Sequence, residues 1–259
     1  MPRGGGAKDI RHLSTRSRLK LVRALQQKKH RDREGLFLVQ GRKLLEELLR
    51  SGWPIDAIHV SERTSVPIDH PKVEVLPQHE LDRIGTLESG NEIVAVVPIP
   101  ERNGKVVLKE DELALALDAI NDPGNLGTVL RVADWFGIDH VFCSRESVDV
   151  FNPKCVQASM GAVFRVKVHY VDLAEELDRS EQEGVSILLA SMEGTNVFQA
   201  ELKRPAILVL GSESHGISPE VRSLKAQTIS IPGSGRSESL NVAMAASALC
   251  MEFYRRSLD

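Results

Sequence analysis

The sequence predicts an α/β protein of two domains, the larger of which is built on a parallel sheet. From residue 111 onward, continuous apolar runs of strand length alternate with helical segments. This alternation is typical of a parallel sheet that is covered by helices on both faces. A segment around Pro98, Pro100, Asn103 and Gly104 separates this part from a smaller α/β unit. The chain has 259 residues, which is enough to bury two cores.

The N-terminal part contains a short series of predicted helices and strands. Residues 1–11 are Gly-rich and basic, and we expect them to form a disordered tail. Over 17–30, Leu19, Val22 and Leu25 follow a helical spacing. A second helix is expected over 41–51, with strands at 36–39, 55–60, 73–76 and 93–97. These elements predict a domain over 12–99 and a linker over 100–110.

The C-terminal domain is expected over 111–259. Its predicted strands cover residues 114–120, 141–144, 165–169, 186–190, 207–210 and 228–231. Its predicted helices cover residues 126–136, 153–160, 173–183, 219–223 and 239–254.

The charges are distributed unevenly along the chain. Residues 1–33 contain eleven Lys and Arg residues and two acids, which gives a net charge of +9. The remainder contains 22 basic and 34 acidic residues, a net charge of −12. A basic arm on an acidic body indicates an anionic partner reached through one end of the protein. Composition alone does not distinguish RNA, DNA and a membrane surface as the partner. A helix face that is merely solvated is a further alternative.

Composition also argues against several classes of protein. No apolar run reaches the roughly 18 to 20 residues that span a bilayer. The three cysteines, Cys143, Cys155 and Cys250, are scattered, and no histidine or cysteine pair has the spacing of metal ligands. We therefore expect no membrane segment, no metal and a reducing compartment, hence a cytoplasmic location. The first 20 residues lack a secretory signal and resemble a mitochondrial transit peptide only weakly.

Three loops that follow predicted strands carry the polar residues of the C-terminal domain. Ligands of open parallel sheets bind beyond the carboxyl ends of the strands. The first loop, NDPGNLGTVLR over 121–131, enters a helix for which Asn125 is the expected N-cap. Arg131 lies six residues later, nearly two turns along, where its cation could face an anionic substrate group. An ordinary turn followed by a surface arginine is the alternative.

The second loop, GSESHG over 211–216, has glycines that let backbone approach a ligand closely. It is not a nucleophile elbow, because Glu213 stands where that motif needs serine. Adjacent Ser214 and His215 are poorly placed for a nucleophile–base pair. The third loop, IPGSGRSESLNV over 231–242, opens a helix of small residues with Ser239 as the expected N-cap. Taken singly, each loop could equally be an ordinary turn.

Together and in this order, the three loops resemble the three motifs of the SpoU (TrmH-like) family of RNA ribose methyltransferases. The resemblance covers about residues 110–256, and the segment over 152–162 also fits it. Residues 14–97 resemble the family's N-terminal RNA substrate-binding domain, which is related to a ribosomal-protein fold. Gln40 and Gly233 stand where relatives often have Glu and Met. The matching motif residues are Asn125, Gly127 and Arg131, then Gly211, Glu213 and Gly216, then Pro232, Gly235, Ser239, Leu240, Asn241 and Val242.

The resemblance implies a SPOUT-type parallel sheet with a deep trefoil knot, and a homodimer formed through the C-terminal domain and its last helix. It also implies methylation of a ribose 2′-OH in structured RNA, with S-adenosyl-L-methionine as the methyl donor. The implied catalytic residues are Arg131, Asn125 and Ser239. The implied cofactor-binding residues are Gly211, Ile231, Leu240, Glu213 and Asn241. Two roles are open for Arg131: it removes the proton itself, or it stabilises the developing alkoxide and orients the phosphate while that phosphate or water takes the proton. The first role conflicts with the fact that arginine is essentially never deprotonated in proteins.

The basic arm supplies the candidate RNA-binding residues, which are Arg16, Arg18, Lys20, Lys28 and Lys29. The N-terminal domain favours rRNA over tRNA as the substrate. A tRNA 2′-O-methyltransferase, and a catalytically silent RNA-binding assembly factor on the same fold, are the alternatives.

Overall fold

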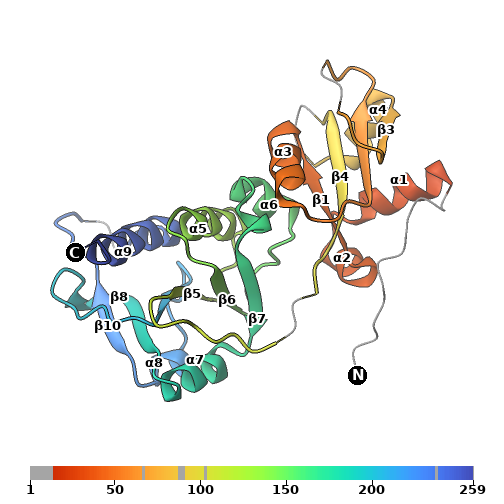
Figure 1. The fold of residues 1–259 in the computed structure, drawn as a ribbon. Coiled ribbons are helices and arrows are strands. Elements are labelled where there is room, and N and C mark those ends of the chain that lie inside the picture. Colours follow the sequence, from red (N-terminus) through yellow and green to blue (C-terminus); the bar gives the residue numbers. More distant parts are fainter. Residues whose placement is uncertain (1–13, 66–67, 87–90, 102–103, 237–238, 259) are drawn as a thin grey trace. The chain divides into compact units, whose positions relative to one another are not determined.

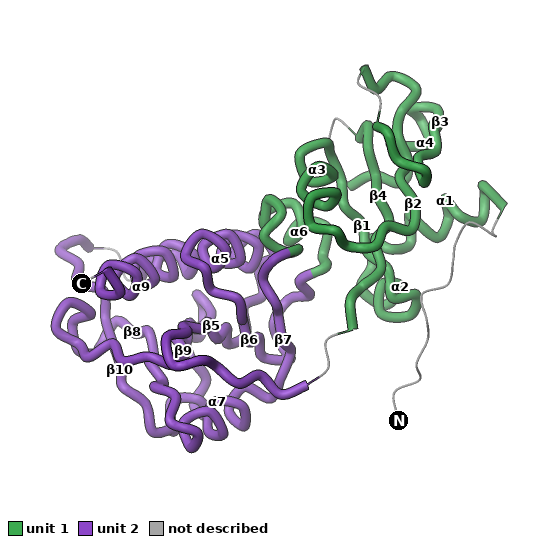
Figure 2. Tube along the Cα trace, viewed as in Figure 1, with its two compact units in different colours: residues 1–101, 151–164 green, residues 102–150, 165–259 purple. Residues whose placement is uncertain are grey.

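The computed structural model describes residues 14–65, 68–86, 91–101, 104–236 and 239–258. The chain forms two compact units (Figure 2), one of residues 1–101 with 151–164 and one of residues 102–150 with 165–259. The predicted tail over 1–11 lies outside the described residues. Residues 151–164, which we predicted as part of the C-terminal domain, belong by their contacts to the first unit.

The first unit contains a mixed four-stranded sheet (Figure 1) in the order β1-β4-β2-β3. Strand β4 is antiparallel to β1 and β2, and β3 is parallel to β2. The strands are β1 (Leu36–Gln40), β2 (Ala57–Ser61), β3 (Val73–Leu76) and β4 (Ile93–Pro98). The helices are α1 (Thr15–Ala24), α2 (Lys28–Glu34), α3 (Arg42–Ser51), α4 (Gln78–Ile84) and, from the later segment, α6 (Pro153–Ser159).

The predicted single helix over 17–30 is wrong, because the structure has two helices there, α1 and α2. Val22 and Leu25 do face the core, as the helical spacing predicts. The interruption is stabilised by Arg31, which is buried and whose Nη1 donates to the carbonyl oxygens of Leu25 (2.9 Å) and Gln26 (2.8 Å). A guanidinium that satisfies the carbonyls at a helix end makes the break favourable. Helix α4 was not predicted, because only Leu81 and Ile84 of its seven residues are buried.

Aromatic rings join the later segment to the rest of the first unit. The rings of Phe37 on β1 and Phe151 lie 4.5 Å apart between centroids, and those of Trp53 and Phe164 lie 5.5 Å apart. Phe37 and Trp53 also meet edge to face at 6.2 Å. Residues 151–164 therefore complete the core of the first unit, although they follow it by about fifty positions in the chain.

The second unit is a six-stranded sheet in the order β10-β8-β9-β5-β6-β7, in which every neighbouring pair is parallel. Helices α5 and α9 cover one face and α7 and α8 the other (Figure 1), which confirms the predicted sheet covered on both sides. The strands are β5 (Leu113–Asp118), β6 (His140–Ser144), β7 (Lys167–Val171), β8 (Ser186–Asn196), β9 (Ala206–Gly211) and β10 (Gln227–Ser230). The helices are α5 (Pro123–Trp135), α7 (Leu173–Gln182), α8 (Pro219–Arg222) and α9 (Val242–Arg256).

Strand β8 is longer than predicted and carries an excursion. Leu189 pairs with Thr228 and Thr195 pairs with Ile229, so residues 190–194 leave the ladder while β10 advances by one residue. At Gly194 a Cβ would lie 2.8 Å from the carbonyl oxygen of Thr228, so only glycine fits where the chain returns. Among the described residues, no helix is long and apolar enough to cross a bilayer.

Two predicted helix caps are corrected. The N-cap of α5 is Asp122, whose carboxylate accepts from the backbone N of Asn125 (2.9 Å), and not Asn125 itself. The N-cap of α9 is Asn241, which accepts from the backbone N of Ala243 (3.0 Å), and not Ser239. In both cases the sequence offered two good capping residues within three positions.

Candidate functional site

A cavity of about 870 Å³ opens beyond the carboxyl ends of β8, β9 and β10. Its walls come from the excursion of β8, the loops after β9 and β10, and the first turns of α9. The apolar side chains that line it include Leu210, Ile217, Ile229, Ile231, Leu240, Val242 and Leu249. This volume is in the range of small-molecule sites, and the position is where open parallel sheets bind ligands.

Three side chains from separate loops form one hydrogen-bonded cluster beside this cavity. The Nδ2 of Asn125 donates to the Oε1 of Glu213 (3.0 Å), and the Nδ2 of Asn241 donates to the same oxygen (2.6 Å). Asn241 also donates to the Oδ1 of Asn125 (3.0 Å). A carboxylate that accepts from two amides is a strong acceptor. Glu213 thus joins the start of α5 to the start of α9 across the loop after β9.

The loop after β9 is closed by its own backbone. Ser212 and Gly216 exchange two backbone hydrogen bonds of 3.0 and 2.8 Å. A Cβ on Gly211 would lie 2.1 Å from the carbonyl carbon of Gly216, and Gly216 itself has a φ of +67°. These two positions therefore require glycine for close approach and for backbone conformation respectively. Glycine at each position follows from the fold of the loop and does not depend on a ligand.

A buried acid anchors the same region and was missed by the sequence analysis. Asp118 ends β5, is 5% exposed, and accepts from the backbone N of Ser218 through Oδ2 (2.7 Å). The loop after β9 is thereby tied to the neighbouring strand. The signal was present in the sequence, because an aspartate that ends the apolar run LALALD is a buried charge that needs partners.

Comparisons with known proteins identify the family. The model of the SpoU rRNA Methylase family matches residues 112–251, and that of the MRM3-like substrate binding domain matches residues 16–95. The chain belongs to the SpoU rRNA methylase family.

Among its relatives is the 23S rRNA (guanosine(2553)-2′-O)-methyltransferase of Bacillus subtilis, 30% identical over 87% of this chain and 91% of that protein. Another is the 23S rRNA (uridine(2479)-2′-O)-methyltransferase of Streptomyces viridochromogenes, 27% identical over 88% of this chain and 86% of that protein. A solved structure of the SpoU methyltransferase AviRb from Streptomyces viridochromogenes with the cofactor AdoMet is 26% identical to this chain, with a TM-score of 0.85 over 95% of this chain and 99% of that one. A putative RNA methyltransferase of the TrmH family from Porphyromonas gingivalis is 40% identical, with a TM-score of 0.82 over 94% and 99%.

The structure brings most of the predicted SpoU site residues together. Gly211, Glu213, Ile231, Leu240 and Ser239 line the cavity. Asn125 and Asn241 lie in the hydrogen-bonded cluster beside it. Arg131 does not line the cavity; it lies exposed on α5 and has no ion pair with any residue that the structure describes. The cavity and the predicted catalytic arginine are thus separate within one chain.

Ser214 and His215 differ from expectation. Their Oγ and Nδ1 atoms lie 2.9 Å apart, so the two adjacent side chains do contact each other, which the sequence had not led us to expect. Neither residue lines the cavity, however, so the pair is not directed at a ligand there.

Of the five predicted RNA-binding residues, four lie exposed on the surface of the first unit and one is largely buried. Arg16, Lys20 and Lys29 are exposed. Lys28 pairs with Asp32 at 2.8 Å on the helix surface. Arg18 is different, because its side chain is only 13% exposed and forms an ion pair with Glu74. That carboxylate also lies 3.2 Å from the Nδ1 of fully buried His59, whose pKa is lowered by burial.

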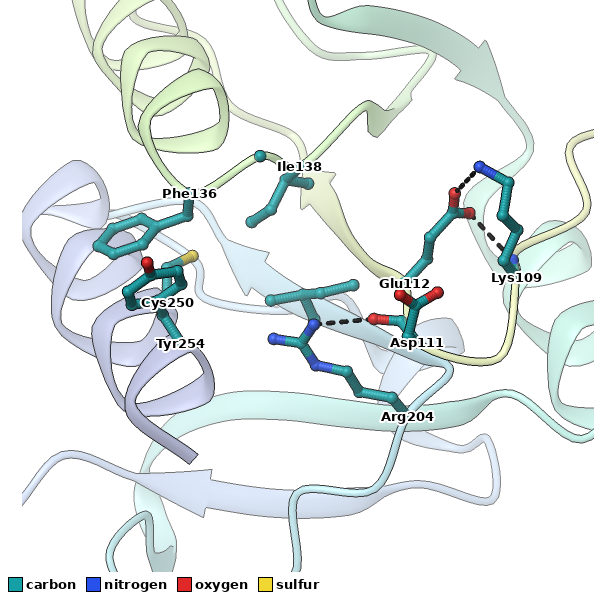
Figure 3. Close-up of a pocket in the computed structure, with 10 residues that line it drawn as sticks. Lys109, Asp111, Glu112, Phe136, Ile138, Arg204, Cys250 and Tyr254 are labelled. Carbon is teal, nitrogen blue, oxygen red and sulfur yellow. Dashed lines mark hydrogen bonds and ion pairs between the residues drawn. The ribbon is translucent and has the colours of Figure 1, made fainter. Parts of the chain in front are cut away.

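A second, smaller pocket of about 300 Å³ lies at the opposite ends of the strands (Figure 3). Glu112 and Leu113 at the start of β5, Arg204 before β9, and Cys250 and Tyr254 of α9 contribute to its wall. Arg204 donates to the carbonyl oxygen of Asp111 (2.8 Å). Burial raises the pKa of the Cys250 thiol to about 12, so this cysteine is not a ready nucleophile. The amino ends of parallel strands are also not where such sheets bind ligands.

Proposed function

We propose that this protein is an S-adenosyl-L-methionine-dependent methyltransferase that modifies a ribose 2′-OH in rRNA. The observation that carries the proposal is the cluster of Asn125, Glu213 and Asn241, which joins the three motif loops at the rim of a cavity of about 870 Å³. Membership of the SpoU family and the activities of the named relatives support the same reaction.

The cavity has features that fit this cofactor. The apolar side chains of Ile231, Leu240 and Val242 offer a surface for an adenine ring, while the loops around Gly211 and Gly233 expose backbone groups for its polar edges. S-adenosyl-L-methionine supplies a methyl group activated by a sulfonium leaving group. The protein itself must therefore align the hydroxyl with that group and assist the loss of its proton.

Arg131 is the proposed catalytic residue. Arginine side chains are not deprotonated in proteins, so Arg131 stabilises the developing alkoxide and orients a neighbouring phosphate. The RNA phosphate or a water molecule then takes the proton. Asn125 and Ser239 shape the surroundings of the hydroxyl, and Glu213 and Asn241 hold the loops in place.

We also propose a homodimer in which a partner subunit completes the site. Met244, Ala248 and Met251 of α9 follow a spacing of four and three residues and are all exposed, at 65% for Met244 and 55% for Met251. Trp135 at the end of α5 is 83% exposed. Exposed apolar stripes of this kind mark interaction surfaces. Because Arg131 lies outside the cavity of its own chain, a dimer would let it serve the partner's cavity.

A complementation experiment tests the dimer and the reaction together. Arg131→Ala lacks the proposed catalytic group. Ala245→Phe places a large side chain in the wall of the cavity, where it should block the cofactor. Each variant alone should be inactive, and mixing them should restore activity if each site draws on both subunits. Light scattering of the native protein should give a dimer at micromolar concentration. A monomer with full activity would contradict the shared site.

The substrate is tested by mapping 2′-O-methyl marks in cellular rRNA and tRNA with and without the gene. Loss of one rRNA mark, restored by purified protein with the methyl donor, is the expected outcome. Loss of a tRNA mark would favour the alternative substrate. Unchanged marks together with tight RNA binding would favour a catalytically silent assembly factor. The trefoil knot and a cytoplasmic location stay predictions from the resemblance and from the cysteine usage.

A further inference from the structure

Few charged side chains line the cavity, and they differ in whether another side chain already binds them. Among the described lining residues, Arg222 is the only one with a cationic side chain, and Glu193 and Glu213 are the acids. Glu213 is engaged through one oxygen, because its Oε1 accepts from both Asn125 and Asn241. Glu193, on the excursion of β8, forms no ion pair with any described residue. The cavity therefore offers one guanidinium to a ligand, and of its two carboxylates only that of Glu193 has both oxygens uncommitted among the described residues.

Arg222 is held in place at the cavity wall. Its Nε donates to the carbonyl oxygen of Ile217 (2.8 Å), and its backbone N donates to the carbonyl oxygen of Ser218 (2.9 Å). Its Nη2 lies 3.0 Å from the point where a Cβ on Gly216 would stand. The missing side chain at Gly216 thus leaves room for the guanidinium beside the loop. Ile217 and Val221 are buried, which fixes the short segment that carries the arginine.

The fixed Nε leaves most of the guanidinium for a ligand. Of its five N–H donors, only the one on Nε has an acceptor within the part of the chain that the structure describes. A planar guanidinium already held through one nitrogen is well suited to a carboxylate, because the two charged groups can form parallel hydrogen bonds. The neutral edge of an adenine or a ribose can accept a hydrogen bond from it but adds no opposite charge.

We propose that Arg222 binds the carboxylate of the cofactor's methionine moiety. This inference rests on the proposed function, because it assumes that S-adenosyl-L-methionine occupies the cavity. The methionine carboxylate is the only anionic group of that cofactor, and Arg222 is the only cation of the described cavity wall. Arg222 lies outside the residues matched to the three motifs, so the resemblance does not assign it this role.

The competing explanation is that Arg222 only braces the loop after β9 through Ile217. The two roles are separated by a pair of ligands, S-adenosylhomocysteine and 5′-methylthioadenosine. Both carry the adenosine and the sulfur, and only the first carries the amino acid carboxylate. Calorimetry with the full-length protein measures the affinity for each ligand without any dependence on catalysis. The variants are Arg222→Met, Arg222→Lys and the control Lys225→Met, whose ammonium pairs with Glu181 away from the cavity.

For Arg222→Met we expect affinity for S-adenosylhomocysteine to fall by roughly tenfold or more, as for loss of a charge-assisted hydrogen bond. Affinity for 5′-methylthioadenosine should change less than about twofold, and Lys225→Met should bind both ligands as the native protein does. Arg222→Lys keeps the charge without the planar fork and should lie between; it also decides the question if Arg222→Met fails to fold. Equal losses for both ligands, or no loss for S-adenosylhomocysteine, would overturn the inference. Failure of the native protein to bind either ligand would instead overturn the proposed function on which it rests.

Discussion

The two units hold their distant segments together in different ways. In the second unit, the loops around the cavity are joined by close backbone contacts and hydrogen bonds, whereas in the first unit the later segment is joined to the sheet by packed side chains. In the second unit, Gly211 passes against Gly216, and a carboxylate joins two asparagines from separate loops. In the first unit, four aromatic rings tie residues 151–164 to the sheet, and one arginine of the basic arm is taken up by an internal ion pair. Substitutions in the second unit should therefore alter binding and chemistry, and those in the first should alter stability and RNA affinity.

The largest expected effect is on catalysis. Arg131→Ala should lower the rate of methyl transfer by roughly 100-fold or more, the range for losing a transition-state stabiliser. Because Arg131 is exposed and has no ion pair among the described residues, stability and affinity for S-adenosylhomocysteine should stay nearly unchanged. Single-turnover methylation measures the rate, calorimetry the affinity, and denaturant unfolding the stability. Arg131→Lys, which keeps a charge but not the fork, should recover part of the rate. Near-normal turnover of Arg131→Ala would remove this residue from the mechanism.

The next effect is on stability of the first unit. Phe151 is 9% exposed and its ring lies 4.5 Å from that of fully buried Phe37. Phe151→Ala should cost about 3 kcal/mol of unfolding free energy, the lower end for such core truncations. Chains with more than one compact unit often unfold in more than one transition, so a probe confined to the first unit is needed. In a Trp135→Phe background, fluorescence of Trp53 follows the first unit alone.

Phe198→Ala is the matched control for this measurement, because that ring is 63% exposed in the second unit. It should change stability by less than about 0.5 kcal/mol. If Phe151→Ala and the control have the same denaturation midpoint, residues 151–164 do not contribute to the core of the first unit.

A smaller effect distinguishes two glycines of the site. Gly211→Ala places a Cβ 2.1 Å from the Gly216 backbone, while Gly233→Ala meets nothing within 4 Å. Both positions belong to loops that line the cavity. We expect Gly211→Ala to weaken binding of S-adenosylhomocysteine by about tenfold through displacement of the loop, and Gly233→Ala to leave it within about twofold. Equal affinities in calorimetry would show that the close backbone crossing is not needed for the cavity.

The sequence predicted the sheet better than the details of the site. Continuous apolar runs located the central strands β5, β6, β8 and β9 of the parallel sheet, because a strand buried on both faces leaves a simple signature. The edge strands β7 and β10 are mostly partly buried and carry a weaker pattern. The end of α1 was missed because it depends on Arg31, which reaches back to carbonyls five and six positions away. The excursion at 190–194 was missed because it depends on the pairing between β8 and β10, which no local pattern encodes.

Within the site, the motif residues were found because they stand together in three short loops. Asn125, Glu213 and Asn241 were each named, although their mutual hydrogen bonds were not. Arg222 lies six residues beyond Gly216, at the end of the four-residue helix α8, which contains no motif. Only the fold shows that its guanidinium returns to the cavity.

The smallest expected effect concerns the basic arm. Arg16, Lys20 and Lys29 are exposed, whereas Arg18 is engaged by Glu74. Replacing the three exposed residues with Glu should weaken RNA binding several-fold and flatten its salt dependence, since each lost phosphate contact lowers the slope by about 0.7 to 0.9. Affinity for S-adenosylhomocysteine should not change, because the cavity lies in the second unit. Filter binding of rRNA fragments over a series of salt concentrations measures the slope.

Arg18→Glu provides the contrast within the same basic arm. It would bring two carboxylates together beside buried His59, and like charges at a partly buried position are unfavourable. We therefore expect it to lower the stability of the first unit more than it lowers the salt slope. Its effect on RNA affinity should follow the fraction of unfolded protein. If the triple substitution leaves both affinity and slope unchanged while Arg18→Glu reduces the slope in fully folded protein, the assignment is reversed: Arg18 would contact RNA, and the exposed cations of the arm would be a solvated surface.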